Sequence, residues 1–136
     1  MIRCDSAGTA AYHIGSLPDK RMRQVASERG LTLTHTARQL SADDFEKFHY
    51  IMAMDESNFE DIRNESYQST GQYLADHRLY LYRLFDAERG GAKIVPDPYF
   101  GEMADFIDTY NIVERSGAQF LDYLIETHNL STDLGD

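Results

Sequence analysis

The sequence has one cysteine, Cys4, and no tryptophan among its 136 residues. A single cysteine excludes an internal disulfide and favours a reducing compartment, so we expect a cytoplasmic protein. No apolar run approaches the length that crosses a bilayer, and residues 1–3 do not begin a signal peptide. We therefore expect a soluble protein without a membrane partner.

Basic side chains are also few: 13 Lys and Arg stand against 23 Asp and Glu, which gives a net charge of −10. A nucleic acid or an anionic membrane attracts a positively charged surface, and this composition does not supply one. We expect no nucleic-acid partner, and we also predict no cofactor and no metal site.

What is present fits one folded domain. Hydrophobic residues make up 42% of the chain and charged residues 26%, which is ordinary for a globular protein. A mass of 15.6 kDa is enough for a single hydrophobic core. The sequence contains no internal repeat, linker or low-complexity segment. We assign residues 1–128 to the domain and residues 129–136 to an acidic tail that frays.

The N-terminal part predicts a strand followed by helices. Residues 1–6 have the pattern of a short strand. A helix is predicted with Ser16 as N-cap and Pro18 in its first turn, and Gly30 stands where a C-terminal cap belongs. A second, short helix is predicted from a capping box, in which Ser41 is followed three residues later by Asp44.

The rest of the chain alternates strands and helices. Residues 50–54 form a continuous apolar run, which predicts a strand buried on both faces. Asp55 follows directly and caps a helix that we expect to reach about Arg63. Residues 78–85 are the next strand candidate. Helical spacing predicts a long helix over 103–127, with a core-facing stripe of Phe106, Tyr110, Val113, Phe120, Leu121 and Leu124. This order indicates an α/β domain with a parallel open sheet and flanking helices.

Asp97 is the candidate catalytic residue. It lies between Pro96 and Pro98, which constrain its backbone from both sides, and Tyr99 and Phe100 follow it. A stiff loop that presents one acid beside two rings suits a general acid with pocket walls for a flat apolar group. The alternative is a proline-rich turn whose aromatic rings pack on the core.

Seven separated runs resemble, in order and spacing, the low-molecular-weight protein tyrosine phosphatases. The resemblance covers the chain from Asp5 to about Leu124. It implies that family's phosphotyrosine phosphatase I-like fold, a Rossmann-like three-layer arrangement. The last run resembles the general-acid loop, which is Asp-Pro-Tyr-Tyr-Gly in many members. The runs are Asp5-Ser6-Ala7-Gly8-Thr9, Tyr12-His13-Ile14-Gly15, Pro18-Asp19-Lys20-Arg21, Ala37-Arg38-Gln39, Asp44-Phe45, Met54-Asp55-Glu56-Ser57-Asn58 and Asp97-Pro98-Tyr99-Phe100-Gly101.

The resemblance implies hydrolysis of a phosphotyrosine protein or a small aryl phosphate through a cysteinyl-phosphate intermediate. A thiolate attacks phosphorus while an acid protonates the departing phenol, and the same carboxylate then activates water. Asp97 matches that acid. Taken alone, His35 is a loop imidazole and Asp55 a helix N-cap. By the resemblance, Tyr12, Tyr99 and Phe100 flank the phosphotyrosine ring, and Ser6, His35 and Asp55 support the phosphate loop by hydrogen bonds.

The sequence also departs from the family. The family nucleophile lies in Cys-x5-Arg-[Ser/Thr], a loop whose backbone amides and arginine hold the phosphate. Here the sixth residue after Cys4 is Ala10, and Cys4 fits a buried strand position. The chain thus resembles a member truncated at the N-terminus, without the first strand and helix, a unit of about 30 residues. We expect it to be inactive, and to self-associate or bind a partner through its incomplete sheet.

Three functions remain open at this point. The first is a tyrosine phosphatase whose phosphate loop lies upstream of Met1. The second is a non-catalytic, phosphatase-like interaction or phosphotyrosine-binding module. The third, a thiol-dependent arsenate reductase, is the poorest fit because that chemistry needs redox cysteines beyond Cys4.

Overall fold

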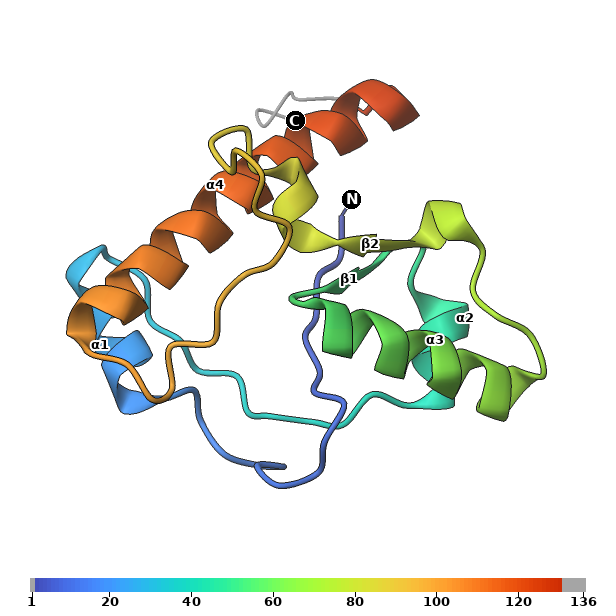
Figure 1. The fold of residues 1–136 in the computed structure, drawn as a ribbon, viewed down its shortest axis with the longest axis horizontal. Coiled ribbons are helices and arrows are strands. Elements are labelled where there is room, and N and C mark those ends of the chain that lie inside the picture. The colour runs from blue at the N-terminus through green and yellow to red at the C-terminus, as the bar shows by residue number, and fades with distance from the viewer. Residues whose placement is uncertain (1, 131–136) are drawn as a thin grey trace, which may run out of the picture.

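Two short parallel strands lie at the centre of the fold (Figure 1). The computed structural model describes residues 2–130. Strand β1 (Ile51–Ala53) pairs with β2 (Leu79–Leu81), with Ile51 opposite Leu79 and Ala53 opposite Leu81. Helix α3 (Glu56–Thr70) connects them, so strand, helix and parallel strand follow one another as the sequence predicts. The predicted α/β class is confirmed.

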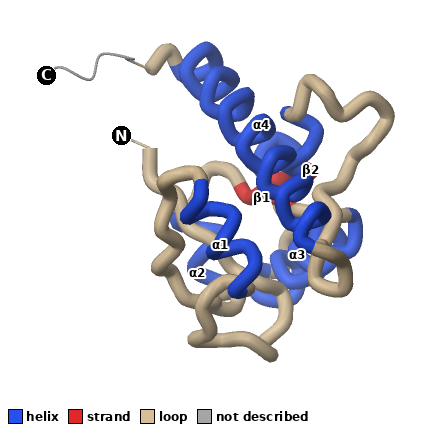
Figure 2. Tube along the Cα trace, turned by 90° about the vertical axis from the view of Figure 1, so that its left-hand side faces the viewer, coloured by secondary structure: helices blue, strands red, loops and turns tan. Residues whose placement is uncertain are grey.

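Helices flank this small sheet. Helix α2 (Ala42–Lys47) packs against α3, and α1 (Lys20–Glu28) packs against the long helix α4 (Met103–His128). Figure 2 shows the strands at the centre, with helices on either side. Within residues 2–130, none of these helices is long and apolar enough to cross a membrane. One hydrophobic cluster joins the sheet to α2 and α3 through Phe45, Ala53, Ile62 and Leu79.

The predicted N-terminal strand is not formed. Residues 2–7 have no regular structure, and Met1 lies outside the described residues. The first ladder contact is a single parallel bridge between Gly8 and Gln39. A strand needs a neighbour that completes its hydrogen bonds, and in the described part of the chain β1 pairs with β2 alone. For the same reason Cys4, predicted to be buried in that strand, is exposed.

Two helix boundaries differ from prediction. Helix α1 is capped by Asp19, whose carboxylate accepts the Arg21 N–H at 2.8 Å, and not by Ser16. Ser16 belongs to a turn instead, since its N–H donates to the His13 carbonyl at 2.9 Å. The predicted end is confirmed, because Gly30 adopts a φ of +81° just after the helix.

Helix α3 continues to Thr70, past the predicted end at Arg63. Its last two turns are polar, and polarity alone does not stop a helix. Gly71, with a φ of +80°, does stop it. The caps in this half of the chain are as predicted. Asp55 accepts the Asn58 N–H at 2.7 Å, and the Asp44 carboxylate accepts the Ser41 N–H at 2.9 Å.

The second strand is shorter than predicted, and the first strand is less buried than predicted. Residues 82–85 leave the sheet as a 3-10 turn, η2 (Tyr82–Phe85), after a similar turn, η1 (Asp76–Arg78), leads into β2. Turn η2 packs along α4, and the ring centroids of Phe85 and Phe120 lie 4.9 Å apart. In β1 only Ala53 is buried, so the prediction of burial on both faces is wrong.

Helix α4 confirms the predicted long helix, but its buried face is narrower than predicted. Phe106 and Leu124 are buried as expected, whereas Val113 and Leu121 are exposed by 37% and 45%. Ile112 takes the buried position beside Val113. A helix that packs on one side covers only a stripe about 100° wide, which leaves adjacent positions outside. Asn129 ends α4 in the left-handed conformation, and most of the predicted tail, residues 131–136, lies outside the described residues.

A buried ion-pair cluster attaches the segment after η2 to α4. The side chain of Asp86 is fully buried. It accepts two hydrogen bonds from Arg115, at 3.0 and 3.1 Å, one from Arg83 at 3.4 Å and one from the Glu88 N–H at 3.0 Å. The hydrogen bonds from Arg115 are the main cause that lowers the pKa of Asp86 to about 2.

Candidate functional site

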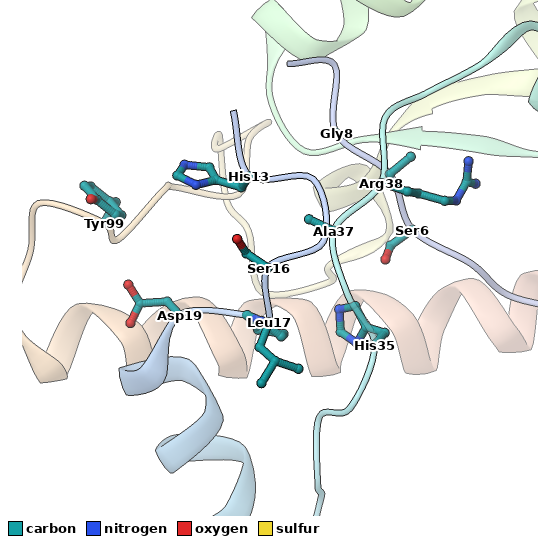
Figure 3. A pocket seen from close by; sticks show the side chains of 12 residues that line it. Ser6, Gly8, His13, Ser16, Leu17, Asp19, His35, Ala37, Arg38 and Tyr99 are labelled. Atoms are coloured by element: carbon teal, nitrogen blue, oxygen red, sulfur yellow. The ribbon is translucent and has the colours of Figure 1, made fainter. Parts of the chain in front are cut away.

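A cavity of about 400 Å³ lies where four segments of the chain meet (Figure 3). Its wall combines the N-terminal segment, the loop before α1, the stretch before α2 and, at Tyr99, the loop between η2 and α4. Most of the exposed wall is apolar. The polar side chains that line it are those of Ser6, His13, Ser16, Asp19, His35, Arg38 and Tyr99.

Backbone hydrogen bonds hold the N-terminal half of this wall together. The Gly8 N–H donates to the Arg38 carbonyl at 2.9 Å, and the Gly15 N–H donates to the Ala37 carbonyl at 2.7 Å. Ala37 in turn donates its N–H to Ser16 at 2.8 Å. The stretch before α2 thus lies between the N-terminal segment and the loop before α1, and the single bridge between Gly8 and Gln39 is the only β-pairing that the described residues form there.

Three of the predicted site residues line the cavity. Ser6 and His35 lie on the wall with Arg38, and Tyr99 lies across from them (Figure 3). The cavity therefore brings together one residue predicted to flank the substrate ring and two predicted to support a phosphate loop. These roles stay predictions.

The other predicted site residues do not line the cavity. Tyr12 is 89% exposed and Phe100 is 97% exposed. Asp97 is also exposed, and one of its carboxylate oxygens accepts the Tyr99 N–H at 3.0 Å. Asp55 serves as the N-cap of α3.

The loop of residues 96–101, here called the acid loop, leaves the carboxyl end of the sheet. The N–H of the buried Val95 donates to the Met54 carbonyl at 2.7 Å, directly after β1. The hydroxyl of Thr109 on α4 donates to the Pro96 carbonyl at 3.2 Å. The alternative of a turn whose rings pack on the core is wrong, because Tyr99 is 53% exposed and Phe100 nearly fully so.

Arg38 lines the cavity, although the sequence analysis named it only within one of the seven family-like runs and gave it no role in the site. Its guanidinium makes two hydrogen bonds of 2.9 Å to the carboxylate of Asp44 and an ion pair of 3.2 Å with Asp5. The hydrogen bonds from Arg38 are the main cause that lowers the pKa of Asp44. Arg38 therefore fastens the N-terminal segment to α2, and its charge is already paired.

The side chains of the described residues were compared with the arrangements that bind metal ions. Across residues 2–130, no group of three or more His, Cys, Asp and Glu side chains is arranged to hold a metal ion.

Comparisons with known proteins agree on one family. The family model for Low molecular weight phosphotyrosine protein phosphatase matches residues 1–130. The low molecular weight phosphotyrosine protein phosphatase of Gallus gallus is 37% identical over 120 residues, which are 88% of this chain and 73% of the relative. The Homo sapiens protein of the same name is 35% identical with the same two coverages.

Solved structures give the same result for the fold. The protein tyrosine phosphatase of Entamoeba histolytica, solved with Hepes in its active site, superposes with a TM-score of 0.78 at 31% identity. The alignment covers 94% of this chain and 78% of that one. A Drosophila arginine phosphatase also gives a TM-score of 0.78 at 31% identity, over 95% of this chain and 78% of its own. Since sequence and fold agree over nearly the whole described chain, this protein belongs to the low molecular weight phosphotyrosine protein phosphatase family.

Proposed function

We propose that this chain is part of a cytoplasmic phosphatase. The phosphatase hydrolyses phosphotyrosine in proteins, or small aryl phosphates. The observation that carries this proposal is the cavity that Ser6, His35 and Tyr99 line beside the acid loop. Asp97 is the proposed general acid and base, and it is exposed at a loop stiffened by two prolines. In the proposed complex, Tyr12, Tyr99 and Phe100 flank the phosphotyrosine ring, and Ser6, His35 and Asp55 support the phosphate loop.

We further propose that this chain alone does not turn over aryl phosphates. Cys4 is its only thiol, it is exposed on the N-terminal segment, and no arginine follows it at the family's spacing. The guanidinium of Arg38, which does line the cavity, is occupied by Asp44 and Asp5. In this proposal, a segment outside residues 1–136 supplies the nucleophile and the backbone amides and arginine that hold the phosphate.

The activity is tested with para-nitrophenyl phosphate. We expect the chain to hydrolyse it no faster than a Cys4→Ser control of the same concentration. A clear rate that disappears in Cys4→Ser would overturn the proposal. The coding DNA upstream of Met1 supplies the complementary test, because an in-frame Cys-x5-Arg segment there identifies a truncated phosphatase.

A phosphotyrosine-binding module is the second candidate. The observation that favours it is the exposure of Tyr99 and Phe100, whose ring centroids lie 4.9 Å apart and which remain free to stack on a flat ring. Calorimetric binding of a phosphotyrosine peptide, compared with its unphosphorylated form, distinguishes this function from the first. An arsenate reductase stays the poorest fit, since Cys4 is the only cysteine.

We also propose that copies of the chain associate through the sheet. Within the described residues β1 pairs with β2 on one side only, and a strand edge with free N–H and C=O groups is a template for another chain. Sedimentation velocity over a dilution series is expected to give a mass that rises with concentration. A constant monomer mass would contradict this proposal.

A further inference from the structure

We propose that Arg21 is the positioning residue of the acid loop: it fixes the backbone of Tyr99 and Gly101, and through it the place of Asp97 beside the cavity. The inference rests on the proposed role of Asp97. Arg21 lies in the first turn of α1, far from the acid loop in sequence, and no feature of the sequence alone connects the two.

The contacts of Arg21 with the loop are direct. Its Nη2 donates to the Tyr99 carbonyl at 2.8 Å, and its Nη1 donates to the Gly101 carbonyl at 3.0 Å. In the part of the chain that the structure describes, no other residue outside the loop itself hydrogen-bonds residues 97–101. Between the anchor at Pro96 and the start of α4, the described hydrogen bonds to the loop from outside it therefore all come from one side chain, that of Arg21.

Arg21 is itself held on two sides. Asp19 accepts hydrogen bonds from its Nε and Nη2, both at 3.3 Å, while it also caps α1. The guanidinium carbon lies 4.2 Å from the centre of the Phe106 ring, and Phe106 is only 2% exposed. A cation over an aromatic face is attracted to it, and the buried ring cannot move away. The guanidinium thus has one orientation, in which its outer nitrogens point at the loop.

The link to Asp97 runs through Tyr99. The carbonyl of Tyr99 is bound by Arg21, and the N–H of the same residue donates to the Asp97 carboxylate at 3.0 Å. Fixing the Tyr99 backbone therefore fixes the donor that orients the carboxylate, and it also sets the ring of Tyr99 against the cavity.

An ammonium group cannot replace this arrangement. The planar fork of arginine presents several donors in fixed directions, so it can serve Asp19, Tyr99 and Gly101 at once and still stack on Phe106. Lysine keeps the charge but offers a compact point donor on a flexible stem. If Arg21 acted only through its charge, lysine would restore the loop.

The test compares loop order in the full chain for Arg21→Gln, Arg21→Lys and Arg29→Gln. Arg29 is a matched control: it also lies at α1, its guanidinium carbon is 4.6 Å from the centre of the Tyr110 ring, and it hydrogen-bonds Asn111 on α4, but it does not contact the loop. Two readouts are recorded without any ligand. One is hydrogen exchange of the Gly101 amide, which donates to the Pro98 carbonyl at 2.7 Å. The other is the ¹⁹F resonance of 3-fluorotyrosine placed at position 99, whose ring lines the cavity and is only 53% exposed.

We expect Arg21→Gln and Arg21→Lys to speed exchange of the Gly101 amide by about five-fold and to move the ¹⁹F resonance toward that of the unfolded chain. Arg29→Gln is expected to change neither, even where it lowers the unfolding free energy equally. Unchanged readouts in Arg21→Gln, restoration by lysine, or equal changes in Arg29→Gln would each overturn the inference. Because no turnover is measured, this outcome is independent of the test of the proposed function.

Discussion

Replacing Asp86 by alanine is expected to lower the free energy of unfolding by about 3 kcal/mol. The substitution removes the shared acceptor of Arg115 and Arg83 at a site where the Asp86 side chain is fully buried. Arg83 then loses its carboxylate partner, and Arg115 keeps only the exposed carboxylate of Glu88. The loss lies at the lower end for buried pairs, because 34% of the Arg115 side chain is in contact with water. Urea denaturation followed by circular dichroism measures it.

Glu88 supplies the matched control. Its carboxylate also lies 3.0 Å from the Nε of Arg115, but its side chain is 71% exposed. Exposed ion pairs contribute little, so Glu88→Ala is expected to cost less than about 1 kcal/mol. Equal losses in the two variants would show that the burial of Asp86 does not set its contribution.

The same cluster predicts a pH dependence. The pKa of Asp86 is lowered to about 2 in the folded chain, against about 3.9 for an unfolded aspartate. A lowered pKa stabilises the fold fully above the unfolded value, and this contribution disappears as the pH falls from about 4 to about 2. The difference in unfolding free energy between the wild type and Asp86→Asn is therefore expected to shrink over that range. A constant difference would contradict the assignment.

Replacing Gly117 by alanine is expected to destabilise the chain by about 1–2 kcal/mol, although helix propensity alone predicts a gain of about 1 kcal/mol in the middle of a helix. A Cβ at position 117 would lie 2.6 Å from the hydroxyl oxygen of Tyr82. Tyr82 lies in η2, the turn that packs along α4. The cost stays in the lower part of the range for overpacking because the ring can tilt slightly.

The Tyr82→Phe background tests this explanation. Without the hydroxyl, the nearest ring atom of residue 82 to the new Cβ is 3.9 Å away, which is an ordinary contact. The lost hydrogen bond from Tyr82 to the Val113 carbonyl is long, at 3.4 Å, so Tyr82→Phe alone is expected to change little. In that background Gly117→Ala should stabilise. A thermal melt that shows the same loss in both backgrounds would refute the steric explanation.

Local sequence signals predicted much of the fold. Asp55 caps α3, the capping box of Ser41 and Asp44 begins α2, and Gly30 follows α1. These features involve hydrogen bonds or backbone geometry within a few residues, which a linear pattern can specify. The errors have a different origin: the strand over residues 1–6 needs a neighbour to pair with, and residues 82–85 turn toward α4 and leave the sheet.

In the candidate site, too, the features set by nearby residues were predicted and those set by the packing of distant segments were not. Local pattern identified the stiff acid loop and its aromatic rings, and the order of short runs identified the family. It did not predict which of these residues line a cavity. Ser6, His35 and Tyr99 meet there, while Tyr12 and Phe100 face away into solvent. Which side chains line the cavity depends on how segments that are distant in sequence pack together. A local sequence pattern does not specify that packing.

The sequence by itself thus determined the α/β order of elements, the family and the composition of the acid loop, because each depends on neighbours along the chain. Only the tertiary structure decided the partners of charged side chains. Arg21 reaches Gly101, Arg115 reaches Asp86 and Arg38 joins Asp5 to Asp44. An arginine is compatible with many acceptors, and the one that it binds is selected by the packing of helices that bring the two groups within hydrogen-bond distance.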